Sequence, residues 1–134
     1  MGCSGSAAGS DAVAKGKLTL GYWNFRGGLR GSGTRYLLQY VGAKYDQTNY
    51  VPGSSQTTGE WPEAKKTLGM THPNLPYITR GNFKLSETFA VQQYICQKYQ
   101  PELLGTTPQE RARVYQLQCI ITDLNMKAMM TCFT

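Results

Sequence analysis

The sequence lacks the features that mark several large classes of protein. It has no apolar run close to the roughly 20 residues that a membrane-spanning helix needs, and its first residues lack the apolar core of a secretory signal. It has one histidine, His72, and four cysteines without C-x-x-C spacing. Such a set favours neither a metal site nor a secreted disulfide scaffold, so we expect no metal and a reducing, cytoplasmic environment.

Clustered charge is also missing. The chain carries 14 Lys and Arg against 8 Asp and Glu, a formal net charge of +6, but only Lys65-Lys66 are adjacent basic residues. A nucleic-acid-binding surface needs a basic cluster, so we expect no nucleic acid partner and a solvated basic surface. Such a surface would still attract small anions.

Composition and patterning divide the 134 residues into four predicted parts. Residues 1–16 are small, polar and glycine-rich, which predicts a flexible tail. Residues 17–99 carry strand and helix patterns and predict one α/β domain. Residues 100–107 contain Pro and Gly and predict a linker, and residues 108–134 predict a long helix with an apolar stripe. The stripe consists of Val114, Leu117, Ile121, Leu124 and Ala128.

The α/β region predicts strand, helix, strand, loop, hairpin and helix, which is the order of the thioredoxin-like fold. Gly42 is expected to stop the first helix, a capping signal at Ser86 to precede the second, and Thr107-Pro108 to open the long helix. The predicted strands cover residues 18–23, 45–51, 75–79 and 83–85, with a turn at Gly81-Asn82, and the predicted helices cover residues 32–42 and 88–99.

Local motifs with matching spacing occur in this frame. They are Thr19-Leu20-Gly21-Tyr22-Trp23, Trp61 with Lys65, Pro73-Asn74-Leu75-Pro76-Tyr77, Glu87-Thr88, and Glu110-Arg111-x-Arg113-Val114 with Asp123. As an ordered set over residues 18–134, they make the chain resemble glutathione transferases of the mu class. The resemblance implies a thioredoxin-like glutathione-binding domain followed by the first helix of an all-α domain that is cut short. It also implies transfer of the glutathione thiolate to hydrophobic electrophiles, a detoxification reaction with glutathione as substrate and no cofactor.

The resemblance assigns the catalytic role to Tyr22. A free thiol with a pKa of about 8.5 is mostly protonated at neutral pH, so a hydroxyl that donates a hydrogen bond to sulfur would favour the thiolate. Tyr22 ends the first predicted strand, which would place its phenol at the carboxyl edge of the sheet, where such folds bind ligands. The alternative is a core tyrosine with a satisfied hydroxyl.

The same resemblance implies a binding site for glutathione that also includes Trp23. Leu75-Pro76 stands where this fold usually carries a cis proline, and the Leu75 main chain would pair with the cysteinyl part of the ligand. An ordinary trans proline at an edge strand is the alternative. Glu87-Thr88 at a helix start would hold the γ-glutamyl end, and first-turn capping explains the same residues without a ligand.

The long loop contributes to the implied site as well. Trp61 and Lys65 are four residues apart, so a helical turn would present an indole N–H and an ammonium group together to the glycyl carboxylate. Partial packing and a solvated charge are the plainer alternative. Asn74 is expected to anchor the loop and to touch the peptide backbone of glutathione.

Several positions depart from the mu pattern. Phe133 stands where the class has a tyrosine near the electrophile, and Thr58 replaces a basic residue of the loop. Glu87-Thr88 replaces Gln-Ser. His72 stands where the class has an aromatic key residue that fills a pocket on the partner subunit. A homodimer and a larger protein assembly therefore both stay open. In a homodimer, the resemblance implies that Asp123 contacts glutathione across the interface.

Two other functions would use the same fold. A non-catalytic binding or scaffold subunit would keep the fold and lose turnover. A thiol–disulfide oxidoreductase would need a nucleophilic cysteine near Tyr22, and the sequence has none there.

The first residues, Met1-Gly2-Cys3-Ser4-Gly5-Ser6, fit the N-myristoylation pattern. Gly2 would carry the myristoyl group and Cys3 a palmitoyl group, because a single acyl chain anchors a protein only marginally. An unstructured leader that matches by chance is the alternative. Membrane contact is expected only through this acylation.

Overall fold

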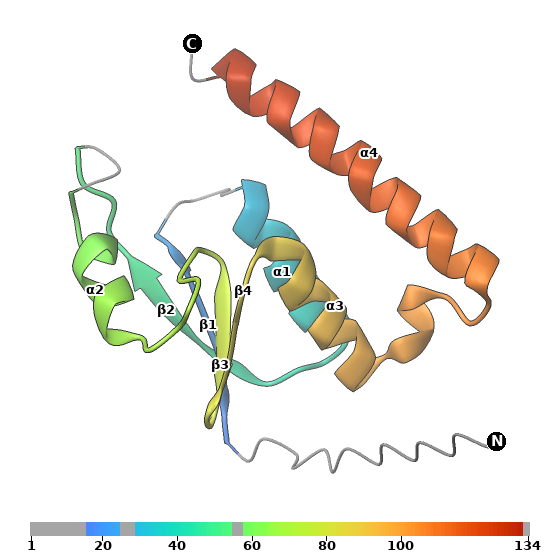
Figure 1. Ribbon diagram of the computed structural model, residues 1–134, viewed down its shortest axis with the longest axis horizontal. Coiled ribbons are helices and arrows are strands. Elements are labelled where there is room, and N and C mark those ends of the chain that lie inside the picture. Colours follow the sequence, from blue (N-terminus) through green and yellow to red (C-terminus); the bar gives the residue numbers. More distant parts are fainter. Residues whose placement is uncertain (1–15, 25–28, 55–57, 133–134) are drawn as a thin grey trace, which may run out of the picture.

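The computed structural model describes residues 16–24, 29–54 and 58–132 (Figure 1). A four-stranded sheet in the order β2-β1-β3-β4 forms its centre. Strand β1 (Leu18–Trp23) pairs with β2 (Tyr45–Tyr50) in parallel and with β3 (Tyr77–Arg80) antiparallel, and β3 pairs antiparallel with β4 (Phe83–Ser86). The predicted thioredoxin-like arrangement of these elements is confirmed.

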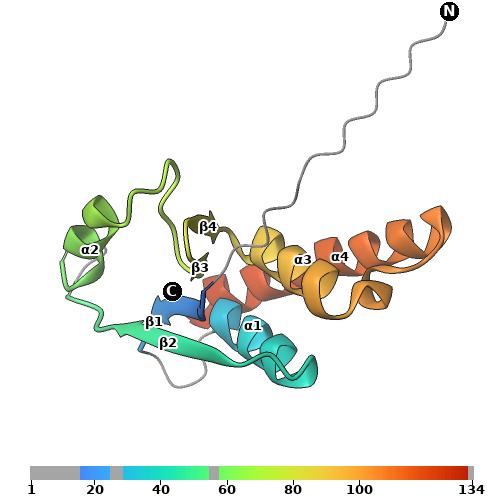
Figure 2. The same ribbon diagram turned by 90° about the horizontal axis from the view of Figure 1, so that it is seen from below.

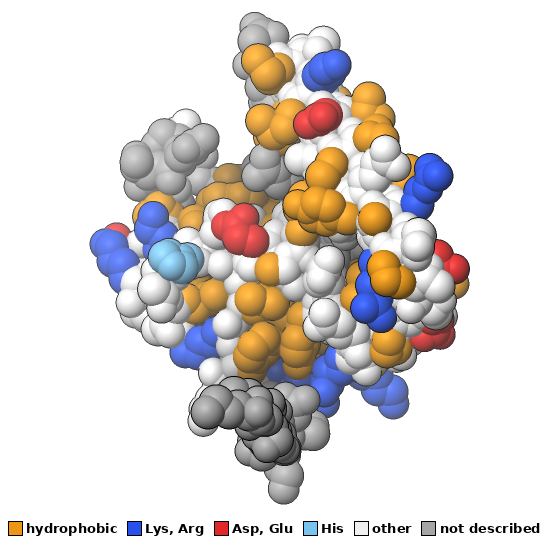
Figure 3. Space-filling model, turned by 45° about the vertical axis from the view of Figure 1, so that its right-hand side comes forward, with side chains coloured by type: hydrophobic (Ala, Val, Ile, Leu, Met, Phe, Trp, Pro, Cys, Tyr) orange, Lys and Arg blue, Asp and Glu red, His pale blue; other side chains and the backbone are white. Residues whose placement is uncertain are grey.

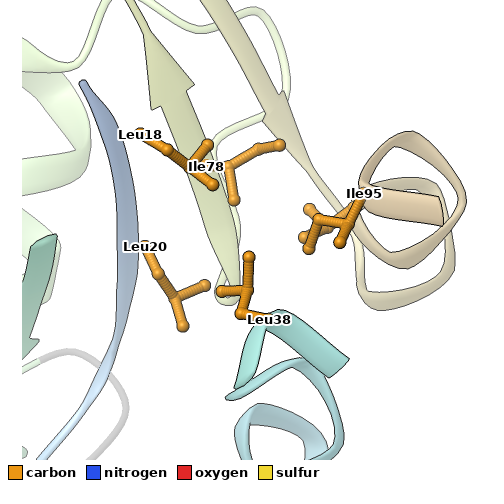
Figure 4. Packing of buried hydrophobic residues seen from close by; sticks show 6 residues of the cluster. Leu18, Leu20, Leu38, Ile78 and Ile95 are labelled. Carbon is orange, nitrogen blue, oxygen red and sulfur yellow. The ribbon is translucent and has the colours of Figure 1, made fainter. Parts of the chain in front are cut away.

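Helices cover both faces of the sheet. Helices α1 (Leu29–Tyr40) and α3 (Thr88–Tyr99) lie on one face, and α2 (Trp61–Thr67) lies on the other (Figures 1 and 2). Figure 4 shows the core on the α1/α3 face, where side chains from both helices and two strands point toward one another. This core consists of Leu18, Leu20, Leu38, Ile78, Val91 and Ile95, all 0–2% exposed.

The first helix differs from its prediction at one end. Gly42 has φ +65°, and the amides of Gly42 and Ala43 donate to carbonyls of the last turn, so the predicted glycine stop is confirmed. At the other end, α1 begins at Leu29 instead of residue 32. Glycine is a poor helix former, but a Cβ at Gly31 would overlap the ring of Tyr22, so tertiary packing uses the bare backbone there.

The hairpin is confirmed and the capping signal at Ser86 is wrong. Gly81 has φ +58° in the turn between β3 and β4. Ser86 is the last residue of β4, and its hydroxyl donates to the carbonyl of His72 at 2.5 Å instead of capping α3. The N-cap is Glu87, with φ +74° and no side-chain capping bond, so the capping explanation of Glu87-Thr88 is also wrong.

The predicted linker is partly ordered. A 3-10 helix, η1 (Pro101–Leu104), packs between α3 and the long helix α4 (Pro108–Cys132). Helix α4 runs past α1 and α3 without joining the sheet, and hydrophobic side chains lie on its surface (Figures 1 and 3). Most of the predicted stripe is exposed, with Leu117 58%, Ile121 53% and Leu124 60% exposed, whereas Val114 is partly buried.

A reciprocal cap opens α4, as Thr107-Pro108 predicts. The Thr107 hydroxyl accepts from the Glu110 amide at 3.2 Å, while the Glu110 carboxylate accepts from the Thr107 amide at 3.1 Å. The same carboxylate accepts from the Thr106 hydroxyl at 2.6 Å and from its amide at 2.7 Å. These bonds, led by that of the Thr106 hydroxyl, lower the pKa of Glu110 to about 2.

This cap is expected to be sensitive to acid. Because the folded-state pKa lies near 2 and the ordinary value is 4.5, the cap stabilises α4 fully above pH 4.5 and is lost as pH falls toward 2. Amide exchange in the first turn of α4 should be faster in Glu110→Gln than in the natural sequence at pH 6. The difference should vanish near pH 2, and Glu102→Gln, at a neighbouring exposed glutamate, is the control. Equal exchange in both proteins at pH 6 would contradict the prediction.

Candidate functional site

Tyr22 lies at the end of β1, beside the first turns of α1. Its side chain is 6% exposed and packs directly on Gly31, where a Cβ would overlap the ring. The Arg35 guanidinium lies 5.5 Å from the ring centroid. No described residue hydrogen bonds to the Tyr22 hydroxyl. The alternative, a core tyrosine whose hydroxyl is satisfied, therefore has no support among the described residues.

Arg35 is the residue that the sequence interpretation missed. Its Nε donates to Gln47 Oε1 at 3.3 Å and its Nη2 to the Trp23 carbonyl at 3.4 Å, which holds the guanidinium over the phenol. The guanidinium is a positive charge close to the phenol, so it favours an anion bound beside the Tyr22 hydroxyl. In the sequence Arg35 looks like any other isolated basic residue, so no local signal could have identified it.

Asn74 connects the strand side of the site with the start of α3. Its Oδ1 accepts from the Leu75 amide at 2.9 Å, and its Nδ2 donates to the Glu87 carboxylate at 2.7 Å. The Leu75–Pro76 peptide bond is cis, as is usual at this place in the fold. The bridge brings Asn74, Leu75 and Glu87 together, and it occupies the N–H of Leu75, one of the main-chain groups of the residue expected to pair with a ligand.

The loop after β2 forms the helix α2, so the helical turn predicted around Trp61 and Lys65 is confirmed. Trp61 is 7% exposed and packs on the rings of Tyr50 and Tyr77. Lys65 is exposed one turn later. The next lysine, Lys66, pairs with Glu63 at 2.6 Å.

An aromatic cluster joins these parts, from the end of β1 beside α1 to the rings under α2. Its buried residues are Tyr22, Tyr50, Trp61, Leu75 and Tyr77. Three residues predicted for the site, Tyr22, Trp61 and Leu75, therefore belong to one packed unit, and Trp23 packs against it partly buried.

Comparison with known proteins identifies the family. The family model described as "Glutathione S-transferase, N-terminal domain" matches residues 18–97. The chain belongs to this family. Its thioredoxin-like sheet and helices are those of the glutathione-transferase N-terminal domain, which confirms the fold predicted for the α/β region.

Several of the curated relatives are named as mu-class glutathione transferases, which supports the mu-like resemblance. The chain is 37% identical over 117 residues to "Glutathione S-transferase Mu 3" of Mus musculus, covering 86% of this chain and 52% of the relative. It is 34% identical over 119 residues to "Glutathione S-transferase B" of Cavia porcellus, covering 87% and 53%. The chain therefore spans about half the length of the curated relatives it matches.

Solved glutathione transferases share the fold. A "major nematode C.elegans specific GST" superposes with a TM-score of 0.63 at 26% identity, over 81% of this chain and 47% of that one. Another Caenorhabditis elegans "glutathione S-Transferase" superposes with a TM-score of 0.68 at 23% identity, over 87% and 53%. At 23% identity, the second structure shows only that the fold is shared.

The remaining predicted residues lie on α4 or outside the described part of the chain. Asp123 is exposed on α4. Phe133, Gly2 and Cys3 lie outside the described residues. Within the described residues no three His, Cys, Asp or Glu side chains are grouped to hold a metal ion, and none of the helices there is long and apolar enough to cross a bilayer.

Proposed function

We propose that this chain is the glutathione-binding part of a mu-like glutathione transferase that conjugates glutathione to hydrophobic electrophiles. The observation that carries the proposal is the buried Tyr22, whose hydroxyl has no partner among the described residues and whose ring lies under the Arg35 guanidinium. The transferase names of the relatives favour this function over a scaffold subunit.

The proposed reaction depends on a hydrogen bond from the Tyr22 hydroxyl to the glutathione sulfur. The Tyr22 hydroxyl donates a hydrogen bond to the glutathione sulfur and stabilises the thiolate, while the thiol proton passes to solvent. The thiolate then attacks an electrophilic carbon, forming a C–S bond as the leaving group departs with its electron pair. Arg35 acts through Tyr22 by favouring negative charge near the phenol oxygen.

Recognition of the tripeptide uses the remaining site residues. Trp61 and Lys65 bind the glycyl carboxylate, the Leu75 main chain pairs with the cysteinyl part, and Glu87 faces the γ-glutamyl ammonium group. Thr88 and the first N–H groups of α3 hold the γ-glutamyl carboxylate; Glu87 supplies no side-chain cap there. Pairing through the Leu75 N–H requires that the Asn74 side chain release it, after which Asn74 can contact the peptide backbone of the ligand.

Titration calorimetry with glutathione tests the proposal, and α2 offers a matched pair of variants. Lys65→Gln should weaken binding by about tenfold, because it removes a charged partner of the glycyl carboxylate. Lys66→Gln should leave binding unchanged, since Lys66 is engaged by Glu63 at 2.6 Å. Absence of glutathione binding by the natural sequence would refute the proposed function.

We expect the 134-residue chain to bind glutathione but to conjugate an aryl halide slowly. The described residues leave apolar side chains of α4 uncovered, such as Leu117 at 58% exposed, and so do not enclose a hydrophobic electrophile. A dinitrobenzene halide assay at saturating glutathione measures this. A turnover number typical of complete enzymes would contradict the expectation. Phe133 beside the electrophile and Asp123 across a dimer interface stay predictions.

We also propose that Gly2 and Cys3, which lie outside the described residues, are acylated and tether the protein to a membrane surface. Two acyl chains anchor stably, and hydrophobic electrophiles concentrate in lipid. Mass spectrometry of the N-terminal peptide from the native source is expected to show a myristoyl group on Gly2 and a palmitoyl group on Cys3. A retained Met1 or an unmodified Gly2 would contradict the proposed acylation, and the protein would then be expected to be cytoplasmic and not attached to a membrane.

A further inference from the structure

Two phenol hydroxyls meet on the α2 face of the sheet. In the strand register, Gly21 of β1 lies between Tyr77 of β3 and Thr48 of β2. A Cβ at Gly21 would overlap the Tyr77 ring, so this ring lies across the bare backbone of β1. Its hydroxyl reaches β2, where it lies 2.6 Å from the Tyr50 hydroxyl.

The paired phenols form the platform on which Trp61 rests. The Trp61 ring stacks on Tyr77 with centroids 5.9 Å apart and planes at 20°, and it meets Tyr50 edge-on at 5.2 Å and 60°. The start of α2 is tied to the end of β2, because the Val51 amide donates to the Glu60 carboxylate at 2.8 Å. The Trp61 indole N–H makes no hydrogen bond to a described residue, so packing sets its direction.

The hydroxyls are costly groups to place there. Tyr50 is 7% and Tyr77 3% exposed, and burial is the main reason why the pKa of Tyr77 is raised above its ordinary value. Two phenylalanines would fill the same space without burying polar atoms, and ring stacking alone leaves ring rotation loosely fixed. A hydrogen bond between two rings fixes their mutual orientation, and Trp61 contacts both of them.

We infer that the Tyr50–Tyr77 hydroxyl pair is a positioning device that aims the Trp61 indole N–H at the glycyl carboxylate of glutathione. The pair itself touches no substrate. The inference rests on the proposed function. It predicts that these two hydroxyls determine the selectivity for glutathione, which ends in glycine, over γ-glutamylcysteine, which lacks the glycine.

Calorimetry with two ligands, glutathione and γ-glutamylcysteine, separates positioning from general stability. Tyr50→Phe should weaken glutathione binding by about three- to tenfold, the effect of one lost hydrogen bond, and leave γ-glutamylcysteine binding unchanged. The double variant Tyr50→Phe/Tyr77→Phe removes both partners and so leaves no buried hydroxyl of the pair unpaired. It should melt near the natural sequence and still show the selective loss.

Tyr99→Phe is the matched control, because the Tyr99 hydroxyl accepts one hydrogen bond, from Arg80 at 3.1 Å, on another part of the fold. It should bind both ligands as the natural sequence does. Unchanged glutathione binding in Tyr50→Phe and in the double variant would overturn the inference, as would an equal loss of both ligands. If the natural sequence itself binds neither ligand, the proposed function fails, which is a different result from lost selectivity.

Discussion

Tyr22→Phe is expected to shrink the thiolate fraction of bound glutathione at neutral pH by about 10- to 100-fold, the effect of one hydrogen bond to a charged acceptor. The pKa of the bound thiol rises because its thiolate loses the hydroxyl donor, while glutathione affinity stays nearly unchanged because the main recognition groups lie elsewhere. Ultraviolet titration of the thiolate in the complex measures the pKa. Calorimetry measures the affinity.

Two further variants make this test specific. Tyr36→Phe removes the hydroxyl of an exposed tyrosine on α1, 70% exposed, and should leave the thiol pKa unchanged. Arg35→Gln removes the cation above the ring and should raise the thiol pKa by less than Tyr22→Phe does, because it leaves the hydroxyl donor in place. A thiol pKa in Tyr22→Phe equal to that of the natural sequence would remove Tyr22 from the mechanism.

Gly21→Ala is expected to be the most destabilising single methyl addition in the sheet. The new Cβ would overlap the Tyr77 ring, which is 3% exposed and cannot move without displacing Tyr50 and Trp61. Overpacking of this kind costs about 1–3 kcal/mol, and we expect the upper end, with a fall in melting temperature of about 10 °C. Urea unfolding followed by circular dichroism measures the free energy of unfolding.

The matched control is Gly33→Ala, a methyl addition in the interior of α1. Its Cβ would meet only the Gln92 side-chain amide at 3.3 Å, and alanine is the better helix former, so stability should hold or rise slightly. Equal losses in the two variants would show that Gly21 has no special packing role. A stable Gly21→Ala protein would mean that the Tyr77 ring does not lie on β1.

Local sequence signals accounted for the elements and for part of the site. The turn at Gly81-Asn82 predicted the hairpin, and Thr107-Pro108 predicted the start of α4, because turn and cap chemistry act over a few residues. The capping signal at Ser86 was wrong because a local signal does not report distant partners. The Ser86 hydroxyl bonds to His72, 14 residues away in the sequence. The hydroxyl therefore donates to the His72 carbonyl and does not cap α3.

The sequence by itself determined the order of strands and helices and placed Tyr22, Trp61 and Leu75 within motifs. Only the tertiary structure decided that Arg35 lies over Tyr22, that Asn74 bridges to Glu87, and that Tyr77 crosses Gly21 to meet Tyr50, 27 residues away in the sequence. Periodicity and turn chemistry report each residue's near neighbours. These contacts depend instead on β1 lying between β2 and β3, an arrangement fixed by burial of the whole sheet.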